Sequence, residues 1–184
     1  MKRSKPEQDH TSGHLEEYFQ PVTFQPIGRV RSPYTERFGT PRQPVVTDQV
    51  KSDGAMEGRI ELLPGKEFEQ ALDGLEGFDR IWVLYHLHLN DGFSPQVRPP
   101  RGPGKKIGIF ATRAPHRPAP VGLSCLRLLR IEGRTLHVRG LDILDGSPVL
   151  DIKPYVPDID SFPGARAGWL SDLDPREPDR FVPS

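Results

Sequence analysis

The chain has 184 residues, equal numbers of acidic and basic residues and a mean hydropathy of −0.55, values typical of one soluble folded domain. No apolar run approaches the roughly 20 residues of a membrane span, and the N-terminus lacks the apolar core of a signal peptide. Because Cys125 is the only cysteine, an internal disulfide is excluded, and we expect a cytoplasmic protein.

Short apolar runs, separated by many of the 21 prolines and 18 glycines, predict a chain of short strands. In chain order, the expected strands are residues 24–32, 58–63, 80–88, 107–110, 123–131, 135–138 and 149–152. Residues 66–75 predict the one helix, because Phe68 and Leu75 share its apolar face and Gly77 can end it. Residues 132–134 predict a hairpin turn. Strands without alternating helices predict an antiparallel barrel or sandwich.

Three segments lie outside these elements. Residues 1–23 are polar and aperiodic, which predicts a disordered tail, and the Pro- and Asp-rich residues 161–184 predict an irregular one. Residues 24–160 are then the single folded domain, and residues 91–106 within it predict a basic loop. The sequence has no G-x-G-x-x-G, no Walker-type phosphate loop and no C-x-x-C, so a Rossmann-type cofactor site is not expected.

Positive charge is concentrated in the middle of the chain. Residues 97–140 hold ten Lys and Arg residues against a single acid, Glu132. Such a region within a chain of zero net charge predicts either a phosphate-bearing partner or a solvated basic face.

Polar residues at strand ends and turns are the candidates for ligand binding. Arg113 and Arg117 lie in a stretch with three prolines, which predicts a stiff loop that either holds a carboxylate, phosphate or base, or faces solvent. Asp142 follows a strand and could accept hydrogen bonds from an amine or from ribose hydroxyls. Asp145 precedes Gly146 and is interpreted as a turn former.

Asp151, Lys153 and Tyr155 alternate with apolar residues, so they should point to one side of a strand and face either a cleft or water. His86 and His88 also share one face, which is compatible with a hydrogen-bonded or a core histidine. A metal-dependent hydrolase built on these histidines and Asp142 is a weaker alternative, because nothing in the spacing demands a metal, and no metal is expected.

Six segments together resemble the TrmO/TsaA-type tRNA methyltransferases over residues 24–160, most of the chain. The segments are PIGRVRSPY (26–34), PRQP (41–44), GLEGFDRIWVLYHLH (74–88), VRPPR (97–101), IFATRAPHRPAPVGLS (109–124) and LDILDGSPVLDIKPYVP (141–157). The resemblance implies a mainly β fold, a small antiparallel β-barrel with one short helix and long Pro/Gly-rich loops. It also implies a homodimer with the cofactor near the subunit interface.

The activity that the resemblance implies is methyl transfer from S-adenosylmethionine to N6 of the threonylcarbamoyl-modified adenosine 37 of tRNA. Carried over position by position, the cofactor contacts fall on Arg42, Gln43, Pro44, His88, Leu89, Arg113, Leu123, Arg139, Gly140, Leu141 and Asp142. Lys153, Asp151 and Tyr155 are the candidate catalytic residues, which would orient the acceptor base or take its proton. The basic loop of residues 98–106, with Arg117 and Arg127, would hold the RNA backbone.

Three residues depart from the family pattern. Ala119 stands where the family usually has Asn, Leu89 where Gln is often found, and Ser147 where Thr is common. Two alternatives therefore accompany the expected activity: a module that binds S-adenosylmethionine or RNA without transferring a group, and a methyltransferase with a different acceptor.

Overall fold

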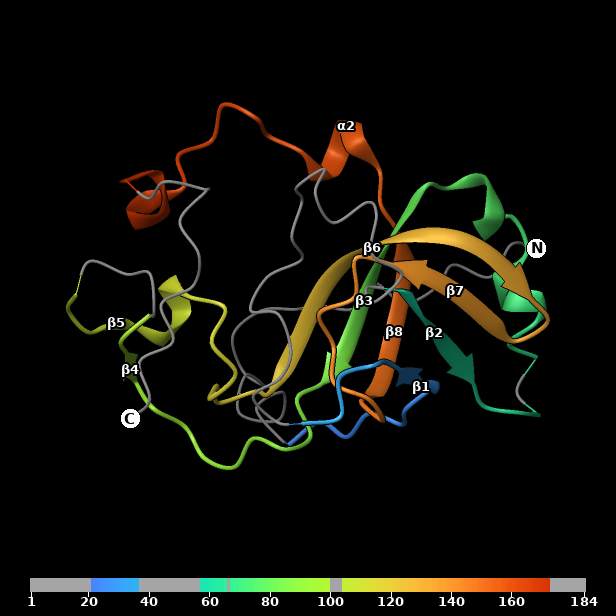
Figure 1. The fold of residues 1–184 in the computed structure, drawn as a ribbon, viewed down its shortest axis with the longest axis horizontal. Coiled ribbons are helices and arrows are strands. Elements are labelled where there is room, and N and C mark those ends of the chain that lie inside the picture. Colours follow the sequence, from blue (N-terminus) through green and yellow to red (C-terminus); the bar gives the residue numbers. More distant parts are fainter. Residues whose placement is uncertain (1–20, 37–56, 66, 100–103, 173–184) are drawn as a thin grey trace, which may run out of the picture.

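Six antiparallel strands close into a barrel in the computed structural model, which describes residues 21–36, 57–65, 67–99 and 104–172 (Figure 1). Around the barrel the strands follow the order β1-β2-β7-β6-β3-β8. Their bounds are β1 (Gly28–Arg31), β2 (Glu57–Leu62), β3 (Arg80–His86), β6 (Val121–Glu132), β7 (Thr135–Arg139) and β8 (Pro148–Pro154). The closed barrel confirms the mainly β fold and decides against the sandwich.

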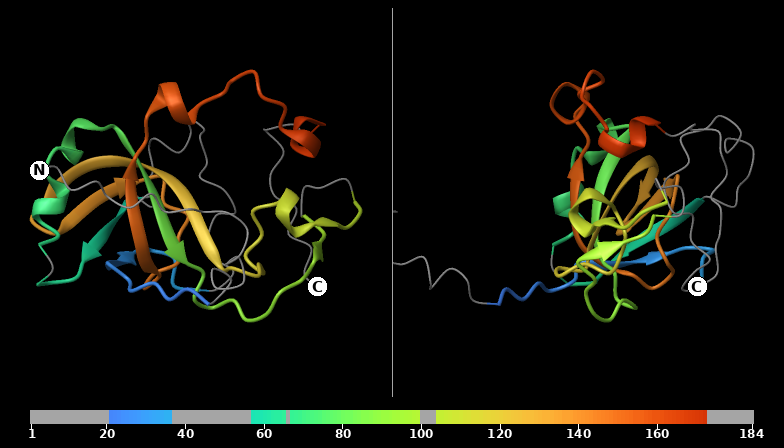
Figure 2. Two further views of the ribbon diagram at one scale, coloured as in Figure 1. Left: turned by 180° about the vertical axis from the view of Figure 1, so that it is seen from behind. Right: turned by 90° about the vertical axis from the view of Figure 1, so that its left-hand side faces the viewer.

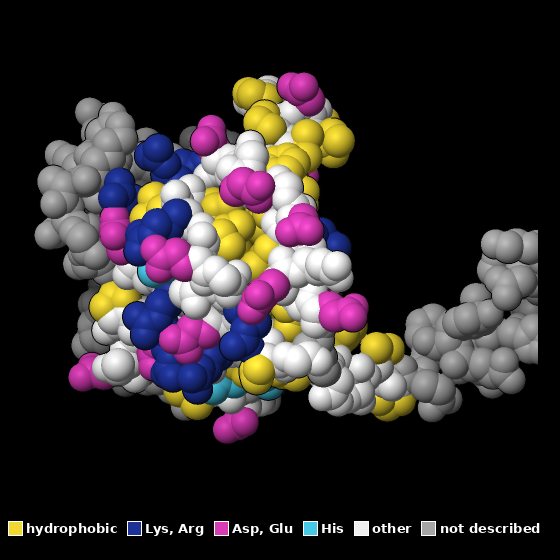
Figure 3. Space-filling view, turned by 90° about the vertical axis from the view of Figure 1, so that its right-hand side faces the viewer, with side chains coloured by type: hydrophobic (Ala, Val, Ile, Leu, Met, Phe, Trp, Pro, Cys, Tyr) yellow, Lys and Arg dark blue, Asp and Glu magenta, His cyan; other side chains and the backbone are white. Residues whose placement is uncertain are grey.

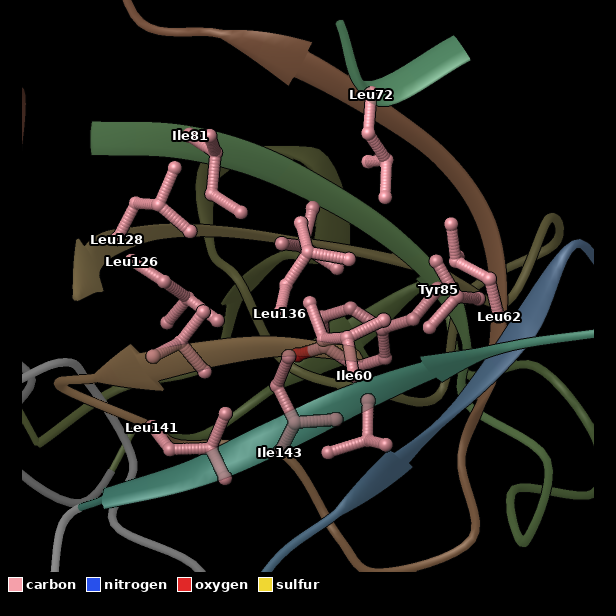
Figure 4. Close-up of a cluster of buried hydrophobic side chains, with 14 residues drawn as sticks. Ile60, Leu62, Leu72, Ile81, Tyr85, Leu126, Leu128, Leu136, Leu141 and Ile143 are labelled. Carbon is pink, nitrogen blue, oxygen red and sulfur yellow. The ribbon is translucent and has the colours of Figure 1, made fainter. Parts of the chain in front are cut away.

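The barrel interior is a filled apolar core, as expected for so few strands. Alternate residues of each strand are buried, as in β3, where Ile81, Val83 and Tyr85 point inward. Leu72 packs onto this cluster from above in Figure 4, and Leu141 packs onto it from below. Every strand therefore has one face in the core and one face outside it.

Strand β6 links the two halves of the barrel because it has twelve residues and two partners. Its first half pairs with β3, where His86 lies opposite Val121, and its second half pairs with β7. The register shifts between Leu128 and Arg130, a β-bulge that lets the long strand bend from one partner to the other.

The short elements lie outside the barrel. A two-stranded sheet of β4 (Gln96–Val97) and β5 (Ile107–Gly108) leads into the 3-10 turn η5 (Ile109–Ala111). After β8 the chain forms the short helix α2 (Pro157–Asp160) and the 3-10 turn η6 (Gly168–Asp172). Both views of Figure 2 show this last segment leaving the barrel and reaching the β4–β5 side, where Trp169 Nε1 donates to the carbonyl of Ala111 at 2.8 Å.

The helix predicted over residues 66–75 is absent from the described residues of this range, and this prediction was wrong. Two 3-10 turns replace it, η3 (Gln70–Leu72) and η4 (Leu75–Gly77). Glu67 and Gly74 have positive φ angles of 54° and 81°, which an α-helix cannot include. The apolar residues still face the core, with Leu72 buried and Phe68 and Leu75 packed against it.

Strand boundaries also differ from the prediction. The first strand begins at Gly28 rather than at residue 24, after Pro26, whose ring nitrogen cannot donate to a ladder. The strand expected over 107–110 ends at Gly108, where η5 begins.

Of the two predicted tails, residues 1–20 and 173–184 lie outside the described residues, and residues 161–172 contain η6. Within the part of the chain that the structure describes, no helix is both long enough and apolar enough to cross a membrane.

Candidate functional site

A polar cluster lies where the inner face of β6 meets the segment that follows β7. The buried Ser124 hydroxyl donates to Oδ1 of Asp142 at 2.6 Å. The same hydroxyl lies 3.5 Å from the phenol oxygen of Tyr85, which reaches it from β3. These three side chains interrupt an otherwise apolar barrel, and their polar atoms satisfy one another there.

The ring of Tyr85 fits at this position because Gly122 has no side chain. A Cβ built on Gly122 would lie 2.3 Å from the Tyr85 Cζ atom, far inside van der Waals contact. Gly122 and Tyr85 are cross-strand partners of β6 and β3, so the small residue makes room for the large one. This fit aims the phenol oxygen at Ser124.

Burial changes the acid–base properties of this cluster. It raises the pKa of Asp142, and the hydrogen bond from Ser124 and the positive charge of Arg113 act in the opposite direction. Burial, and next the Asp142 charge, raise the pKa of Tyr85 to about 12, so that phenol stays protonated at neutral pH. Burial and the same carboxylate also raise the pKa of Tyr34. Asp142 is therefore a half-buried acceptor close to hydroxyl groups and one cation.

Arg113 comes from the proline-rich loop before β6, which a second arginine organises. Nη1 of Arg117 donates to the carbonyls of Thr112 at 2.8 Å, Ile109 at 3.3 Å and Ala114 at 3.4 Å. The two arginines predicted as a pair thus have different roles, because Arg117 folds back onto its own loop while Arg113 is exposed. Nη1 of Arg117 therefore helps to fix the loop, and the expectation that Arg117 also binds RNA stays a prediction.

The turn before β8 borders the same cluster. Asp145 is a turn residue as predicted, because its Oδ1 accepts from the backbone N–H of Ser32 at 2.9 Å and its own N–H donates to the Tyr34 carbonyl at 2.7 Å. These bonds hold the end of β1 beside Asp142. On the other side, Nδ1 of His88 lies 3.4 Å from the buried Ser147 hydroxyl, so His88 is a hydrogen-bonded histidine next to the site.

The remaining predicted cofactor residues differ in how much of each side chain a ligand could reach. Arg139 ends β7 and is ion-paired with Glu57 of β2, and Gly140 follows with a φ of 84°. Leu141 is fully buried, so only its backbone can reach a ligand. Leu123 and Leu89 are exposed, and Leu123 lies on the outward face of β6 opposite Leu84, the other face from Ser124.

The three candidate catalytic residues lie on the outside of the barrel. Asp151 and Lys153 are paired with Leu84 and Trp82 of β3 and with each other at 2.8 Å. Tyr155 packs against the Trp82 ring, with 5.6 Å between ring centroids. The alternation correctly placed Asp151 and Lys153 on one side, but that side is not the one that holds Asp142.

Two further predictions concern the PRQP segment and a metal site. Arg42, Gln43 and Pro44 lie outside the described residues. Among the residues that are described, no group of three or more His, Cys, Asp or Glu side chains could hold a metal ion.

Sequence reasoning missed Ser124, Tyr85 and Tyr34. One signal could have found the first two: both are polar residues on the inward phase of a strand whose other inward residues are apolar. The signal for Tyr34 is weaker, because it lies in a loop and its place depends on the turn at Asp145.

The chain is similar to a family of known proteins. Residues 29–161 match the model of the tRNA-methyltransferase O N-terminal domain. A probable S-adenosyl-L-methionine-binding protein of Methanothermobacter thermautotrophicus is 49% identical over 140 residues, which cover 76% of this chain and 94% of the relative. The tRNA (adenine(37)-N6)-methyltransferase of Escherichia coli K12 is 40% identical over 153 residues, covering 79% of this chain and 63% of that protein.

A solved structure is also similar. The crystal structure of TrmO from Pseudomonas aeruginosa matches with a TM-score of 0.64 and 40% identity, covering 81% of this chain and 62% of that one. The chain therefore spans less than two thirds of the Escherichia coli and Pseudomonas proteins.

Proposed function

Because the chain belongs to the tRNA-methyltransferase O family, we propose that it transfers a methyl group from S-adenosylmethionine to N6 of adenosine 37 in tRNA. The acceptor is the threonylcarbamoyl-modified form of that adenosine, as the resemblance of the sequence implies. The observation that carries the proposal is the half-buried Asp142 carboxylate near the exposed Arg113, within the segment that matches the family.

The donor set of the cluster fits S-adenosylmethionine. One oxygen of Asp142 takes the Ser124 hydrogen bond, and a carboxylate retains further acceptor sites for an amine, a ribose hydroxyl or a sulfonium charge. Arg113 supplies a cation for the carboxylate of the methionine moiety. We assign the donor to these two residues, with His88, Leu89, Leu123, Arg139, Gly140, Leu141 and the PRQP segment of Arg42, Gln43 and Pro44 as further contacts.

S-adenosylmethionine, when bound, supplies an activated methyl group. The protein residues then have the task of bringing donor and acceptor amine into line, which is the main source of catalysis in a transfer between two bound substrates. Arg98, Lys105 and Lys106 are exposed in the basic loop and would contact RNA phosphates. The assignment of Asp151, Lys153 and Tyr155 to acceptor binding or proton removal stays a prediction.

We also propose that the chain works as a homodimer in the cytoplasm, with the donor near the interface. Val121 and Leu123 leave 39% and 47% of their surface exposed on the outward face of β6, and Phe110 leaves 77%. Apolar side chains gathered beside a proposed ligand site suit a second subunit. Light scattering of the purified protein would test this: a monomeric mass at micromolar concentration contradicts it.

A second candidate function is donor binding without transfer. It is favoured by the relative from Methanothermobacter thermautotrophicus, 94% of which this chain covers and which is named only as a probable binding protein. The two candidates differ in whether methyl groups enter RNA when donor is bound.

One experiment separates them. The purified protein is incubated with donor carrying a labelled methyl group and with tRNA from cells with and without the threonylcarbamoyl modification, and the labelled nucleoside is identified. We expect label in the modified adenosine only. Label elsewhere corrects the acceptor, and tight donor binding without any label supports the binding module. Arg113→Ala should weaken donor binding sharply, whereas unchanged affinity removes Arg113 from the site.

A further inference from the structure

Three arginines on the outer surface of β1 and β2 converge on one carboxylate. Nε of Arg29 and Nε of Arg31 donate to Oε2 of Glu61, at 3.0 and 3.1 Å. Nε of Arg59 donates to the other oxygen, Oε1, at 2.9 Å. Three positive charges therefore surround one negative charge, and we call these four residues the arginine cluster.

The cluster leaves most of its hydrogen-bonding capacity facing outward. A guanidinium carries five N–H donors, and the contact with Glu61 uses only the one on Nε. The side chains of Arg29 and Arg59 remain 55% and 52% exposed, whereas Glu61 is 26% exposed beneath them. Glu61 thus fixes the positions of the arginines without neutralising them, which lowers the entropy cost of binding an anion there.

The barrel places this cluster beside the proposed donor site. Arg31 also reaches Asp145, with Nη1 3.5 Å from Oδ2, and Asp145 holds the end of β1 next to Asp142. Arg113, from the proline-rich loop before β6, also acts on the charge of Asp142. The segment from Asp142 to Asp145 is therefore close to two sources of positive charge, Arg113 of the proline-rich loop and Arg31 of the arginine cluster.

Figure 3 looks at the molecule from the side on which β1, β2 and β7 lie, and it shows dark-blue side chains gathered there with magenta ones between them. Ion pairs account for much of this surface, since Arg139 is paired with Glu57 and Arg130 with Glu132. Among the residues that the structure describes, the arginine cluster differs because three arginines share Glu61, and Asp145 is a second acid near Arg31.

We propose that the arginine cluster is an RNA-binding surface that holds phosphates of the tRNA backbone while the acceptor nucleotide lies at the donor site. The proposal rests on the proposed function for the identity of the RNA. Bidentate recognition of phosphate is the contact for which arginine is best suited, and the exposed guanidiniums of Arg29 and Arg59 are held in place by Glu61. A backbone bound at both Arg113 and the arginine cluster would pass close to the segment 142–145.

The test uses the full chain and two readouts, affinity for tRNA without donor and KM for tRNA in methyl transfer. The variants Arg29→Gln and Arg59→Gln, singly and combined, each remove a positive charge from an exposed side chain. Arg166→Gln is the control, because it removes the same charge from the segment after α2, which Figure 1 and Figure 2 show on the other side of the molecule from β1 and β2. Circular dichroism checks that each variant is folded.

We expect the double variant to weaken tRNA binding and raise KM for tRNA while leaving kcat and donor affinity unchanged. The slope of log affinity against log salt should become shallower by roughly 0.7–0.9 for each arginine that contacts a phosphate. A salt slope and KM equal to those of Arg166→Gln would overturn the inference. If wild type binds tRNA but transfers no methyl group, the proposed function fails and the binding readout still decides on the cluster.

Discussion

Ser124 and Asp142 are joined by a 2.6 Å hydrogen bond from the Ser124 hydroxyl to Oδ1 of the carboxylate. Ser124 belongs to the inner face of β6, and Asp142 to the segment that follows β7. The bond ties the connection after β7 to the barrel wall. It also compensates part of the cost of burying the carboxylate, since an ionised group away from water needs donors around it.

Ser124→Ala should weaken donor binding, because Asp142 loses the donor that orients it. We expect donor affinity to fall roughly fivefold to tenfold, and the free energy of unfolding to fall by about 1–3 kcal/mol, the cost of an unsatisfied buried group. Isothermal titration calorimetry and urea denaturation measure the two effects. Cys125→Ala, the neighbouring position on the outward face of β6, is the control and should leave donor affinity unchanged. Equal donor affinities for Ser124→Ala and wild type would contradict this role.

Asp142→Asn should reduce donor binding without lowering the stability of the fold. Because burial raises the pKa of Asp142 above its ordinary value of 3.8, the folded state binds the proton more tightly than the unfolded state. This contribution is therefore fully present below pH 3.8 and is lost as pH rises through the raised pKa. The uncharged amide avoids that loss and can still accept from Ser124.

The asparagine variant should accordingly be at least as stable as wild type at neutral pH, and its donor binding should be severely reduced. Thermal denaturation and calorimetry at neutral pH provide the comparison. A large loss of stability would show that the carboxylate charge stabilises the fold and would contradict a role in ligand binding alone.

Gly122→Ala should destabilise the barrel, because the added methyl would lie 2.3 Å from Cζ of Tyr85. We expect a loss of about 1–3 kcal/mol in the free energy of unfolding, the usual effect of overpacking a filled core. Gly108→Ala is a matched control, since its Cβ meets nothing within 4 Å. In a Tyr85→Leu background the same Gly122→Ala change should cost less, and an unchanged cost would exclude the ring as the cause.

Protonation of Glu61 should lower the free energy of unfolding at acid pH. Hydrogen bonds from Arg59, then from Arg29 and Arg31, lower the pKa of Glu61 from 4.5 to about 2. A lowered pKa gives a contribution that is present above pH 4.5 and is lost as pH falls toward 2. The difference in unfolding free energy between wild type and Glu61→Gln should therefore shrink over that range in urea denaturation. Glu76→Gln, an exposed acid in η4, is the control.

The strand pattern was predictable because inward and outward residues alternate along strands such as β3 and β7. Residues 80–88 and 135–138 gave β3 and β7 to within two residues, since apolar side chains mark the buried phase. The helix over 66–75 was not predictable from its spacing. Its apolar residues do reach the core, but two 3-10 turns deliver them, and the choice depends on backbone angles at Glu67 and Gly74.

The site was only partly predictable. Position in a proline-rich loop and after a strand identified Arg113 and Asp142 as candidates; burial raises the pKa of Asp142, and the Arg113 charge acts in the opposite direction. Ser124 escaped notice because its partner is distant in sequence, and only barrel closure brings β6 to the segment after β7. Arg117 bonds carbonyls of its own loop while Arg113 is exposed. This difference depends on where the loop places its carbonyl groups, which residue spacing does not reveal.

The hydrogen bond from Trp169 to the Ala111 carbonyl provides an intrinsic fluorescence signal near the proposed site. The chain has two tryptophans, and the indole of Trp82 is held separately by Asp160 at 3.0 Å. Ala111 lies two residues before Arg113, so any rearrangement of the proline-rich loop before β6 should alter the emission of Trp169. In a Trp82→Phe background, fluorescence would then follow ligand capture in real time without an attached dye.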